Sequence, residues 1–299
     1  VQWVNNVVSG TAYVIVTGKN MGSGADYSTC IGMASFTITP ANGKIGYDIT
    51  SLTKTYGNEP FVNPLTNYDK RPGHEGQNAD GEVTYESSVP SVATVDEITG
   101  EVTILKSGTT NIIATATNGA NYVYSTTEDD NTASYELTVD KAAGNISFGY
   151  PSPSQTWSPT TSNNKYTQMA TITGDATATY SIGSTNTCGA SINATTGEVT
   201  FTQSGDVQVI ATVTDTERYK YATNATKSVS YSLHVNKAVG SISFANLTPR
   251  KTYSLTSASN TFTQTVTNTG DATVTYSVPA TNNSYNTCGA TINSSTGVV

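Results

Sequence analysis

The feature that most constrains this sequence is an internal repeat of about 96 residues. The segment ASYELTVDKA at 133–142 returns 96 residues later as VSYSLHVNKA. The tetrapeptide GDAT that begins at Gly174 returns at Gly270, and a Thr-Gly pair recurs at Gly100, Gly197 and Gly297. Because each copy of such a repeat folds as one structural unit, the sequence predicts a tandem array rather than a single large domain.

Short alternating runs within each copy indicate β-strands. Tyr135, Leu137 and Val139 fall on one face of such a run, with polar residues between them. Alternation of this kind is typical of a half-buried antiparallel strand, and turn signals such as Thr-Gly and Ser-Gly separate the runs. We therefore expect an all-β chain built from tandem immunoglobulin-like β-sandwich repeats of roughly 100 residues each, without a stable helix.

Aligned copies of the repeat set the predicted domain boundaries. The expected parts are the back (C-terminal) part of one repeat at 1–40, whole repeats at 41–140 and 141–236, and the front (N-terminal) part of another repeat at 237–299. The sequence therefore starts and stops at nearly the same point of the repeat, so the two partial repeats are complementary. Half a sandwich exposes its core face and its strand edges, so neither part is expected to be stable alone.

Three ordered motifs carry a resemblance to a known family. They are KTYGNEPF at 54–61, VTYESSVPSVATV at 83–95, and a closing Tyr-x-Leu-x-Val-x-Lys-Ala at 135–142. Together they resemble the MBG-type bacterial Ig-like repeat, which occurs in long tandem arrays in bacterial surface and secreted proteins. The resemblance implies an Ig-like sandwich and an extracellular location at the bacterial surface. It implies no catalytic residue and no cofactor.

Two arrangements would complete the partial repeats. In the first, which the family habit of tandem arrays favours, the chain is a three-repeat window of a longer continuous array. In the second, residues 1–40 of one copy insert their strands into residues 237–299 of the next, giving a head-to-tail filament by strand complementation. Either way, the expected partners are adjacent repeats or neighbouring copies of the same protein.

Composition excludes several classes of protein. Charged residues make up 12% of the chain, against about 25% in an average soluble domain. With a net charge of −8 and only 14 scattered Lys and Arg residues, the chain lacks the basic surface that nucleic acid requires. No apolar run approaches the roughly 20 residues that would span a membrane as a helix.

The two histidines are the first candidates for chemistry. His234 occupies the place that Thr138 occupies in the preceding repeat, which indicates a solvated strand residue. His74 lies in an insertion at 69–80 and could bind a metal together with Glu75, Asp80 and Glu82. The spacing of these residues matches no known ligand pattern, so we expect no metal site and no catalytic site.

Acidic, aromatic and thiol groups give weaker candidates. Glu128-Asp129-Asp130-Asn131 could hold calcium between domains, but a solvated loop is the simpler interpretation because calcium-loop spacing is absent. Four tyrosines in a polar stretch could stack on sugars, although core or edge packing is the simpler interpretation; they are Tyr122, Tyr124, Tyr219 and Tyr221. Cys188 and Cys288 occupy equivalent places. Cys30 and Cys288 would share a completed domain and could pair in an oxidising compartment.

These observations favour a non-catalytic structural region of a bacterial extracellular surface protein that forms a stalk, fibre or filament. The alternative is an adhesin, or a module that binds carbohydrate or a host protein through its tyrosine-bearing loops or the 69–80 insertion.

Overall fold

The computed structural model describes residues 2–4, 8–18, 31–74, 77–221, 227–280 and 284–299. Its elements are almost all β-strands, and only two three-residue 3-10 turns, η1 (Thr161–Asn163) and η2 (Ser257–Ser259), occur among the described residues. The predicted fold class, all-β with tandem Ig-like repeats, is confirmed.

Contacts between residues divide the chain into two compact units. The first comprises Val1–Ile146, Ile172–Thr177 and Val213–Lys227, and the second comprises Ser147–Thr171, Ala178–Thr212 and Ser228–Val299. These units follow contacts rather than the sequence repeat, so the repeat boundaries at 41–140 and 141–236 stay predictions.

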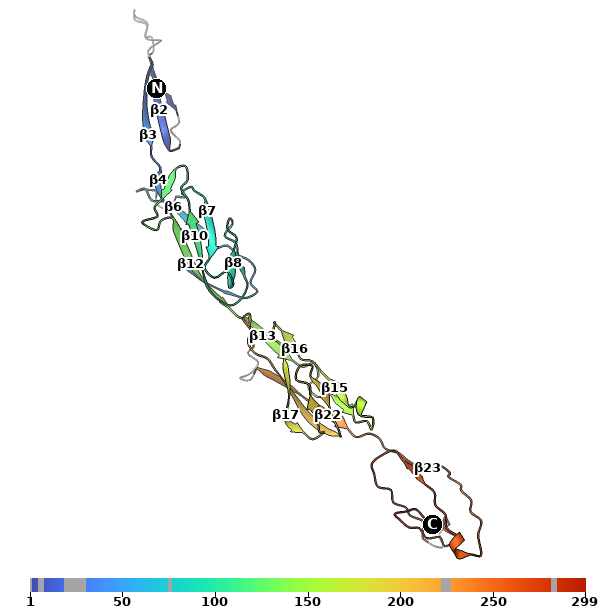
Figure 1. Ribbon diagram of the computed structural model, residues 1–299. Helices are drawn as coiled ribbons and strands as arrows, with labels where there is room; N and C mark the ends of the chain where they lie inside the picture. Colours follow the sequence, from blue (N-terminus) through green and yellow to red (C-terminus); the bar gives the residue numbers. More distant parts are fainter. Residues whose placement is uncertain (1, 5–7, 19–30, 75–76, 222–226, 281–283) are drawn as a thin grey trace, which may run out of the picture. The chain divides into compact units, whose positions relative to one another are not determined.

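Two sheets form the 41–140 repeat. One is four-stranded with the order β5-β12-β10-β7, the other is three-stranded with the order β11-β4-β6, and β8 and β9 pair separately (Figure 1). Their bounds are β4 (Ala41–Tyr47), β5 (Ser51–Thr55), β6 (Leu65–Asp69), β7 (Val83–Ser87), β8 (Ala93–Val95), β9 (Val102–Ile104), β10 (Gly108–Ala116), β11 (Tyr122–Tyr124) and β12 (Thr132–Asp140).

The core of this repeat lies between the two sheets. Ile45 and Tyr47 of β4 are buried in one cluster with Ile112 of β10 and with Tyr135 and Leu137 of β12. The rings of Tyr47 and Tyr135 meet edge to face, with centroids 4.8 Å apart. The alternation that the sequence shows at 135–139 thus points its apolar residues into a sandwich core, as predicted.

The 141–236 stretch repeats the same strands. Its four-stranded sheet, β14-β22-β20-β17, has the order of β5-β12-β10-β7, and its other sheets are β16-β13-β21 and β15-β19-β18. The bounds are β13 (Ala142–Ser147), β14 (Ser154–Thr156), β15 (Lys165–Thr167), β16 (Thr171–Thr173), β17 (Thr179–Asn186), β18 (Ser191–Ile192), β19 (Glu198–Thr200), β20 (Gly205–Thr212), β21 (Tyr219–Tyr221) and β22 (Ser228–Asn236).

The two partial repeats carry fewer strands. Residues before 41 form one three-stranded sheet, β1-β2-β3, from β1 (Gln2–Val4), β2 (Gly10–Thr17) and β3 (Ile31–Ile38). Residues after 236 form a two-stranded sheet from β23 (Ile242–Phe244) and β24 (Val266–Asn268).

The Thr-Gly pair marks one turn that occurs in three copies. Gly100, Gly197 and Gly297 all have a φ close to +70°, a region in which a side chain is strained. A Cβ at these glycines would lie 3.0, 3.1 and 2.7 Å from the rings of Tyr85, Tyr180 and Tyr276, respectively. Two factors therefore require glycine at this position: the positive φ of the backbone, and the tyrosine ring that packs where a Cβ would lie.

We predict that Gly197→Ala lowers the free energy of unfolding of the 141–236 repeat by about 1–2 kcal/mol, because alanine is strained at positive φ. The tight contact with Tyr180 adds to this cost. Urea denaturation monitored by circular dichroism measures the loss. Gly149→Ala is the matched control, because Gly149 has no atom within 4 Å of its would-be Cβ and no positive φ. Equal stability of the two variants would contradict the prediction.

Candidate functional site

Each four-stranded sheet combines strands from the two ends of its repeat. The early strand β5 pairs in parallel with the last strand β12, and β7 pairs with β10. In the next copy, β14 likewise pairs in parallel with β22, and β17 pairs with β20. The front part of a repeat therefore supplies the two outer strands, and the back part supplies the two central strands.

The hairpin β2–β3 has the register of these two central strands. It pairs Gly10 with Ile38, as β10–β12 pairs Gly108 with Val139 and β20–β22 pairs Gly205 with Val235. All three hairpins then continue in the same antiparallel register. This register assigns each hairpin residue a counterpart, meaning the residue at the same place in another repeat.

The inward face of the hairpin is partly exposed, although Ala12 on that face is fully buried. Val16 is 48% exposed, whereas its counterparts Ala114 and Ala211 are both fully buried. Phe36 is 42% exposed, and it occupies the place of the fully buried Leu137 and Leu233. Val16 and Phe36 are therefore more exposed than their counterparts in the two complete repeats.

The front part at 237–299 shows the complementary deficit. Thr275–Val278 has the alternating sequence of β17, and Arg250–Thr252 occupies the place of β14, yet neither stretch is a strand. The strands that pair with β17 and β14 are β20 and β22, and counterparts of those two strands do not occur within 237–299. Among the described residues neither stretch pairs with another strand, and the Tyr276 N–H donates to the Ser294 carbonyl oxygen at 2.9 Å.

An apolar groove opens in this front part. It has a volume of about 280 Å³, and its lining includes Phe244, Phe262, Tyr276, Val278 and Val299. Ile242 is 63% exposed beside it, whereas its counterpart Ile146 is 2% exposed. The groove therefore lies at the place of the sandwich core of the 141–236 repeat, where Tyr180 and Val199, the counterparts of Tyr276 and Val299, are buried.

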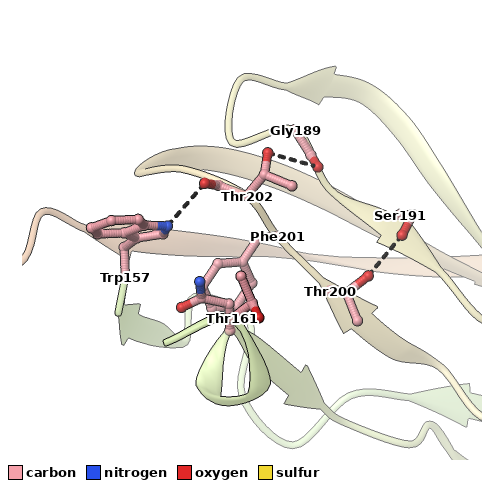
Figure 2. A pocket seen from close by; sticks show the side chains of 8 residues that line it. Trp157, Thr161, Gly189, Ser191, Thr200, Phe201 and Thr202 are labelled. Carbon is pink, nitrogen blue, oxygen red and sulfur yellow. Dashed lines mark hydrogen bonds between the residues drawn. The ribbon is translucent and has the colours of Figure 1, made fainter. Parts of the chain in front are cut away.

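A second hollow lies beside Trp157 in the 141–236 repeat (Figure 2). It encloses about 240 Å³, and its lining combines the Trp157 indole with the hydroxyls of Thr161, Ser191 and Thr200. The indole Nε1 donates a hydrogen bond to the Thr202 carbonyl oxygen at 2.9 Å, and the Ser191 and Thr200 hydroxyls form a hydrogen bond with each other. None of its lining residues is charged.

The inserted 69–80 loop is held by ion pairs. Asp69 has a fully buried carboxylate, which accepts from Arg71 Nη2 at 2.5 Å and from the Tyr122 hydroxyl at 3.1 Å. His74 Nδ1 lies 3.5 Å from Asp69 Oδ2 and 3.1 Å from Gln77 Oε1. Hydrogen bonds from Arg71, against the opposing effect of burial, hold the pKa of Asp69 well below its usual range.

The proposed metal ligands of this loop do not come together. Asp80 accepts hydrogen bonds from the backbone N–H and the side-chain amide of Asn121, Glu82 is exposed, and Glu75 lies outside the described residues. In the part of the chain that the structure describes, no three His, Cys, Asp or Glu side chains gather closely enough to hold a metal ion.

Lysines pair with acidic side chains of the cluster at 128–131. Asp130 is buried and paired with Lys70, and Lys44 Nζ lies 3.5 Å from its carboxylate. Glu128 also pairs with Lys70 Nζ, at 3.2 Å. Despite its burial, Asp130 has a lowered pKa because both lysines are close. The loop is therefore an internal ion-pair network, where the sequence suggested solvated carboxylates or calcium.

The remaining candidates have structural surroundings. His234 is exposed on the outward face of β22, as predicted, and its Nδ1 lies 2.6 Å from Asp206 Oδ1 on β20. Tyr124 and Tyr221 are buried, and Tyr219 packs edge to face on Tyr56, which agrees with core or edge packing. Cys188 is a buried free thiol, Cys288 is an exposed one, and Cys30 lies outside the described residues.

Sequence reasoning missed three features. The Asp69–Arg71 pair was hidden inside a loop that looked solvated, although an Asp two residues before an Arg is a usable signal. The Trp157 hollow and the groove at 237–299 depend on surfaces that only three-dimensional packing defines. For the groove there was an indirect signal, because the repeat comparison predicts that 237–299 holds only the front part of a repeat.

Comparisons with known proteins agree with the fold. Residues 72–127 match the family model described as Bacterial Ig-like domain (group 2). A search of curated proteins finds no match. No helix among the described residues is long and apolar enough to cross a membrane.

Several solved structures are similar to the chain. Drosophila N-cadherin EC1-4 is 14% identical with a TM-score of 0.24, over 79% of this chain and 61% of that one. The protocadherin GammaB4 extracellular domain is 15% identical with a TM-score of 0.30, over 78% of this chain and 40% of that one. Domains 4 and 5 of the S-layer protein SbsC are 17% identical with a TM-score of 0.29, over 67% of this chain and the whole of that one. The chain thus spans less than two thirds of the two cadherin-type structures.

We predict that Asp69→Asn destabilises the protein at pH 6 and less at pH 2.5. A carboxylate whose pKa is depressed by folding stabilises the fold above its unfolded pKa of about 4, and this stabilisation is lost as the pH falls toward the folded pKa. Urea midpoints of the two proteins at both pH values measure the effect. Glu136→Gln, on the exposed outward face of β12, is the control. The same loss at both pH values would show that the Asp69 charge is unimportant.

Proposed function

We propose that this chain is a non-catalytic structural repeat region of a bacterial extracellular surface protein, of the MBG type, and that it forms a stalk, fibre or filament. Its partners are further Ig-like repeats. The back part β2–β3 and the front part at 237–299 each pair with the complementary part of a neighbouring repeat. That neighbour is either continuous with the chain or a second copy of it.

One observation carries the proposal. The hairpin β2–β3 has the register of the two central strands of a sheet, and the stretches beside the groove have the sequence of the two outer strands. In complete repeats, the strand at the place of β2 pairs on one side with β7 or β17, and the strand at the place of β3 pairs with β5 or β14. Transferring the β17–β20 register places Val16 opposite Tyr276 and Val14 opposite Val278. In this structure β1 pairs with that edge of β2, with Trp3 opposite Val14, so the proposed pairing requires β1 to leave the edge. Val14 and Val16 would then enter the groove that Tyr276, Val278 and Phe262 line.

The residues that would enter the groove are not copies of those they replace. Ala34 stands where the complete repeats have Tyr135 and Tyr231, and Phe36 stands where they have Leu137 and Leu233. One aromatic side chain therefore remains on the inward face of the strand, shifted by two residues. The total volume on that face changes less than the Tyr-to-Ala difference alone suggests.

Two ways of adding a strand fit this geometry. A head-to-tail contact of this kind uses two different surfaces on each copy, so it extends into a filament rather than closing as a dimer. A covalent tandem array uses the same pairing within one chain. Denaturing electrophoresis of the natural material separates the two, because a band near the 31.3 kDa of this chain excludes the continuous array, and a single very large species excludes separate copies.

An adhesin that binds carbohydrate or a host protein is the second candidate function. The tyrosines that the sequence suggested for sugar stacking pack within the protein. Tyr124 and Tyr221 are buried, and the Tyr122 hydroxyl donates a hydrogen bond to Asp69. The observation that favours this candidate is instead the uncharged, hydroxyl-lined hollow beside Trp157.

We predict that Val16→Asp strongly weakens self-association of the 299-residue chain. The substitution leaves the hairpin intact, because Val16 is half exposed there, but in a completed sandwich it would bury an unpaired carboxylate. Sedimentation equilibrium should show association of the unmodified chain and a weakening of about a hundredfold or more for the variant.

Thr11→Asp is the matched control for this experiment. It adds the same charge on the outward face of the same strand, where the 141–236 repeat carries Asp206. It should associate like the unmodified chain. Equal weakening by both substitutions, or an unmodified chain that stays monomeric at every concentration, would rule out the proposed pairing.

A further inference from the structure

We propose that one loop of a repeat is a docking surface for the preceding repeat of the same chain, and that charge at one position of this contact selects which repeat docks. The loop is residues 118–121 before β11 and residues 215–218 before β21, and we call these two the junction loops. The inference deepens the proposed function and rests on it in taking the chain as a structural array. It does not depend on pairing of the partial repeats, because every contact lies within the first compact unit.

The two junction loops share their internal hydrogen bonds. The side-chain oxygen of the first residue, Asn118 or Asp215, accepts from the backbone N–H six residues later, at 2.9 and 2.8 Å. The N–H of the second residue, Gly119 or Thr216, donates to the carbonyl oxygen three residues later, at 3.0 Å in both loops. The two loops are therefore built in the same way, although their sequences differ.

A serine of the preceding repeat contacts each junction loop. The Ser107 hydroxyl and the Ser107 backbone N–H donate to the Glu217 carbonyl oxygen at 2.5 and 3.0 Å. The Ser9 hydroxyl likewise donates to the carbonyl oxygen of Ala120, the counterpart of Glu217, and the Ser9 N–H donates to Asn121 Oδ1 at 3.1 Å. Each serine stands immediately before a central strand, β10 or β2, so the same contact occurs at two junctions.

The next carbonyl of each junction loop is bound by the repeat to which the loop belongs. The Asn121 carbonyl oxygen accepts from the Ala41 N–H at 2.7 Å, and the Arg218 carbonyl oxygen accepts from the Ala142 N–H at 2.9 Å. Ala41 and Ala142 are the first residues of β4 and β13, which follow the preceding repeat after a short linker. Two neighbouring carbonyls of one loop thus bind the two repeats that meet there.

Aromatic and cationic side chains extend the contact at the second junction, between 41–140 and 141–236. Tyr219 packs edge to face on Tyr56, with ring centroids 5.6 Å apart. The Arg218 guanidinium lies 5.6 Å from the centroid of the Tyr56 ring, and its Nε donates to the Leu105 carbonyl oxygen at 3.1 Å. This junction therefore combines backbone hydrogen bonds with ring and cation–π contacts.

One position differs in charge between the two junctions, and it differs on both sides at once. Lys106, the residue before Ser107, has its Nζ 2.9 Å from Glu217 Oε1. At the first junction, between 1–40 and 41–140, the corresponding residues are Val8 and Ala120. Hydrogen bonding by Lys106 also lowers the pKa of Glu217, which keeps this pair charged. A cation and a carboxylate thus meet at one junction, and uncharged apolar residues take both places at the other.

This paired difference gives each junction a preferred partner. A loop with Glu217 placed beside Val8 would lose its ion pair, and Lys106 placed beside Ala120 would find no carboxylate. An exposed ion pair changes an equilibrium constant by about fivefold or less. Charge therefore adds selectivity, while the serine and backbone hydrogen bonds supply the contact common to both junctions.

Hydrogen exchange of the Ser107 amide, measured by NMR on the full chain, reports this docking directly, because its N–H donates to a carbonyl of the next repeat. We expect a protected amide in the unmodified chain. Glu217→Lys places like charges at the junction and should accelerate exchange of this amide about three- to tenfold. The acceleration should shrink in about 1 M salt, because salt screens exposed charges.

The double variant Lys106→Glu with Glu217→Lys restores opposite charges at the two positions. Its Ser107 amide should exchange about threefold or more slowly than in Glu217→Lys alone. Arg218 and Lys141 also act on Glu217, so the comparison of both single variants with the double variant isolates the contribution of the Lys106 pair.

Glu198→Lys is the matched control. It reverses one charge of the Lys165–Glu198 pair, which has the same 2.9 Å separation but lies inside the 141–236 repeat. It should leave Ser107 exchange unchanged. Equal acceleration by Glu198→Lys and Glu217→Lys, or a double variant that exchanges as fast as Glu217→Lys, would overturn selection by charge.

The same samples separate this inference from the proposed function. A Ser107 amide that exchanges as fast as in an unfolded chain would overturn the docking surface, whether or not the chain self-associates in sedimentation equilibrium. A protected Ser107 amide that responds to charge as expected, in a chain that stays monomeric, would support the docking surface and overturn only the pairing of the partial repeats.

Discussion

The structure depends on one constraint, the parallel pairing of an early strand of each repeat with its last strand. β5 lies beside β12, and β14 lies beside β22, so a four-stranded sheet closes only when both ends of a repeat are present. Because the core packs against this sheet, the pairing also determines whether the apolar side chains are buried. Ile146 is buried where the sheet is complete, and its counterpart Ile242 is exposed where the central strands are missing.

Much of this architecture could be predicted from the sequence, for physical reasons that are local. Alternation at 135–139 reflects a strand with one buried face, and the Thr-Gly pairs reflect a positive φ beside a tyrosine ring. Both requirements act on residues close together in the chain, so they leave a pattern that recurs with the repeat. The same comparison showed that His234 lies on an outward strand face, because Thr138 fills its place.

What could not be predicted involves residues far apart in the chain. The 69–80 insertion looked like a solvated loop, yet it carries the buried Asp69, which accepts a hydrogen bond from Tyr122, and Lys70, which pairs with the buried Asp130. Likewise, the sequence shows that Tyr56 and Trp157 are counterparts, but not that one is covered by Tyr219 and the other lies beside a hollow. Such contacts depend on packing between loops, for which a short sequence pattern holds no signal.

The register also bears on the expected pairing of Cys30 and Cys288. In the 141–236 repeat, the counterpart of Cys288 is Cys188, whose carbonyl accepts from Thr202 close to the start of β20. The counterpart of Cys30 is Lys227, whose carbonyl accepts from Val213, just past the end of β20. β20 runs for eight residues, which at about 3.3 Å per residue separates its ends by roughly 25 Å. A disulfide needs Cα atoms within about 7 Å. The places of Cys188 and Lys227 thus lie at opposite ends of β20 in the 141–236 repeat. Cys30 lies outside the described residues, so its pairing with Cys288 stays a prediction, and the interactions that hold the complete repeats are strand pairing and apolar burial.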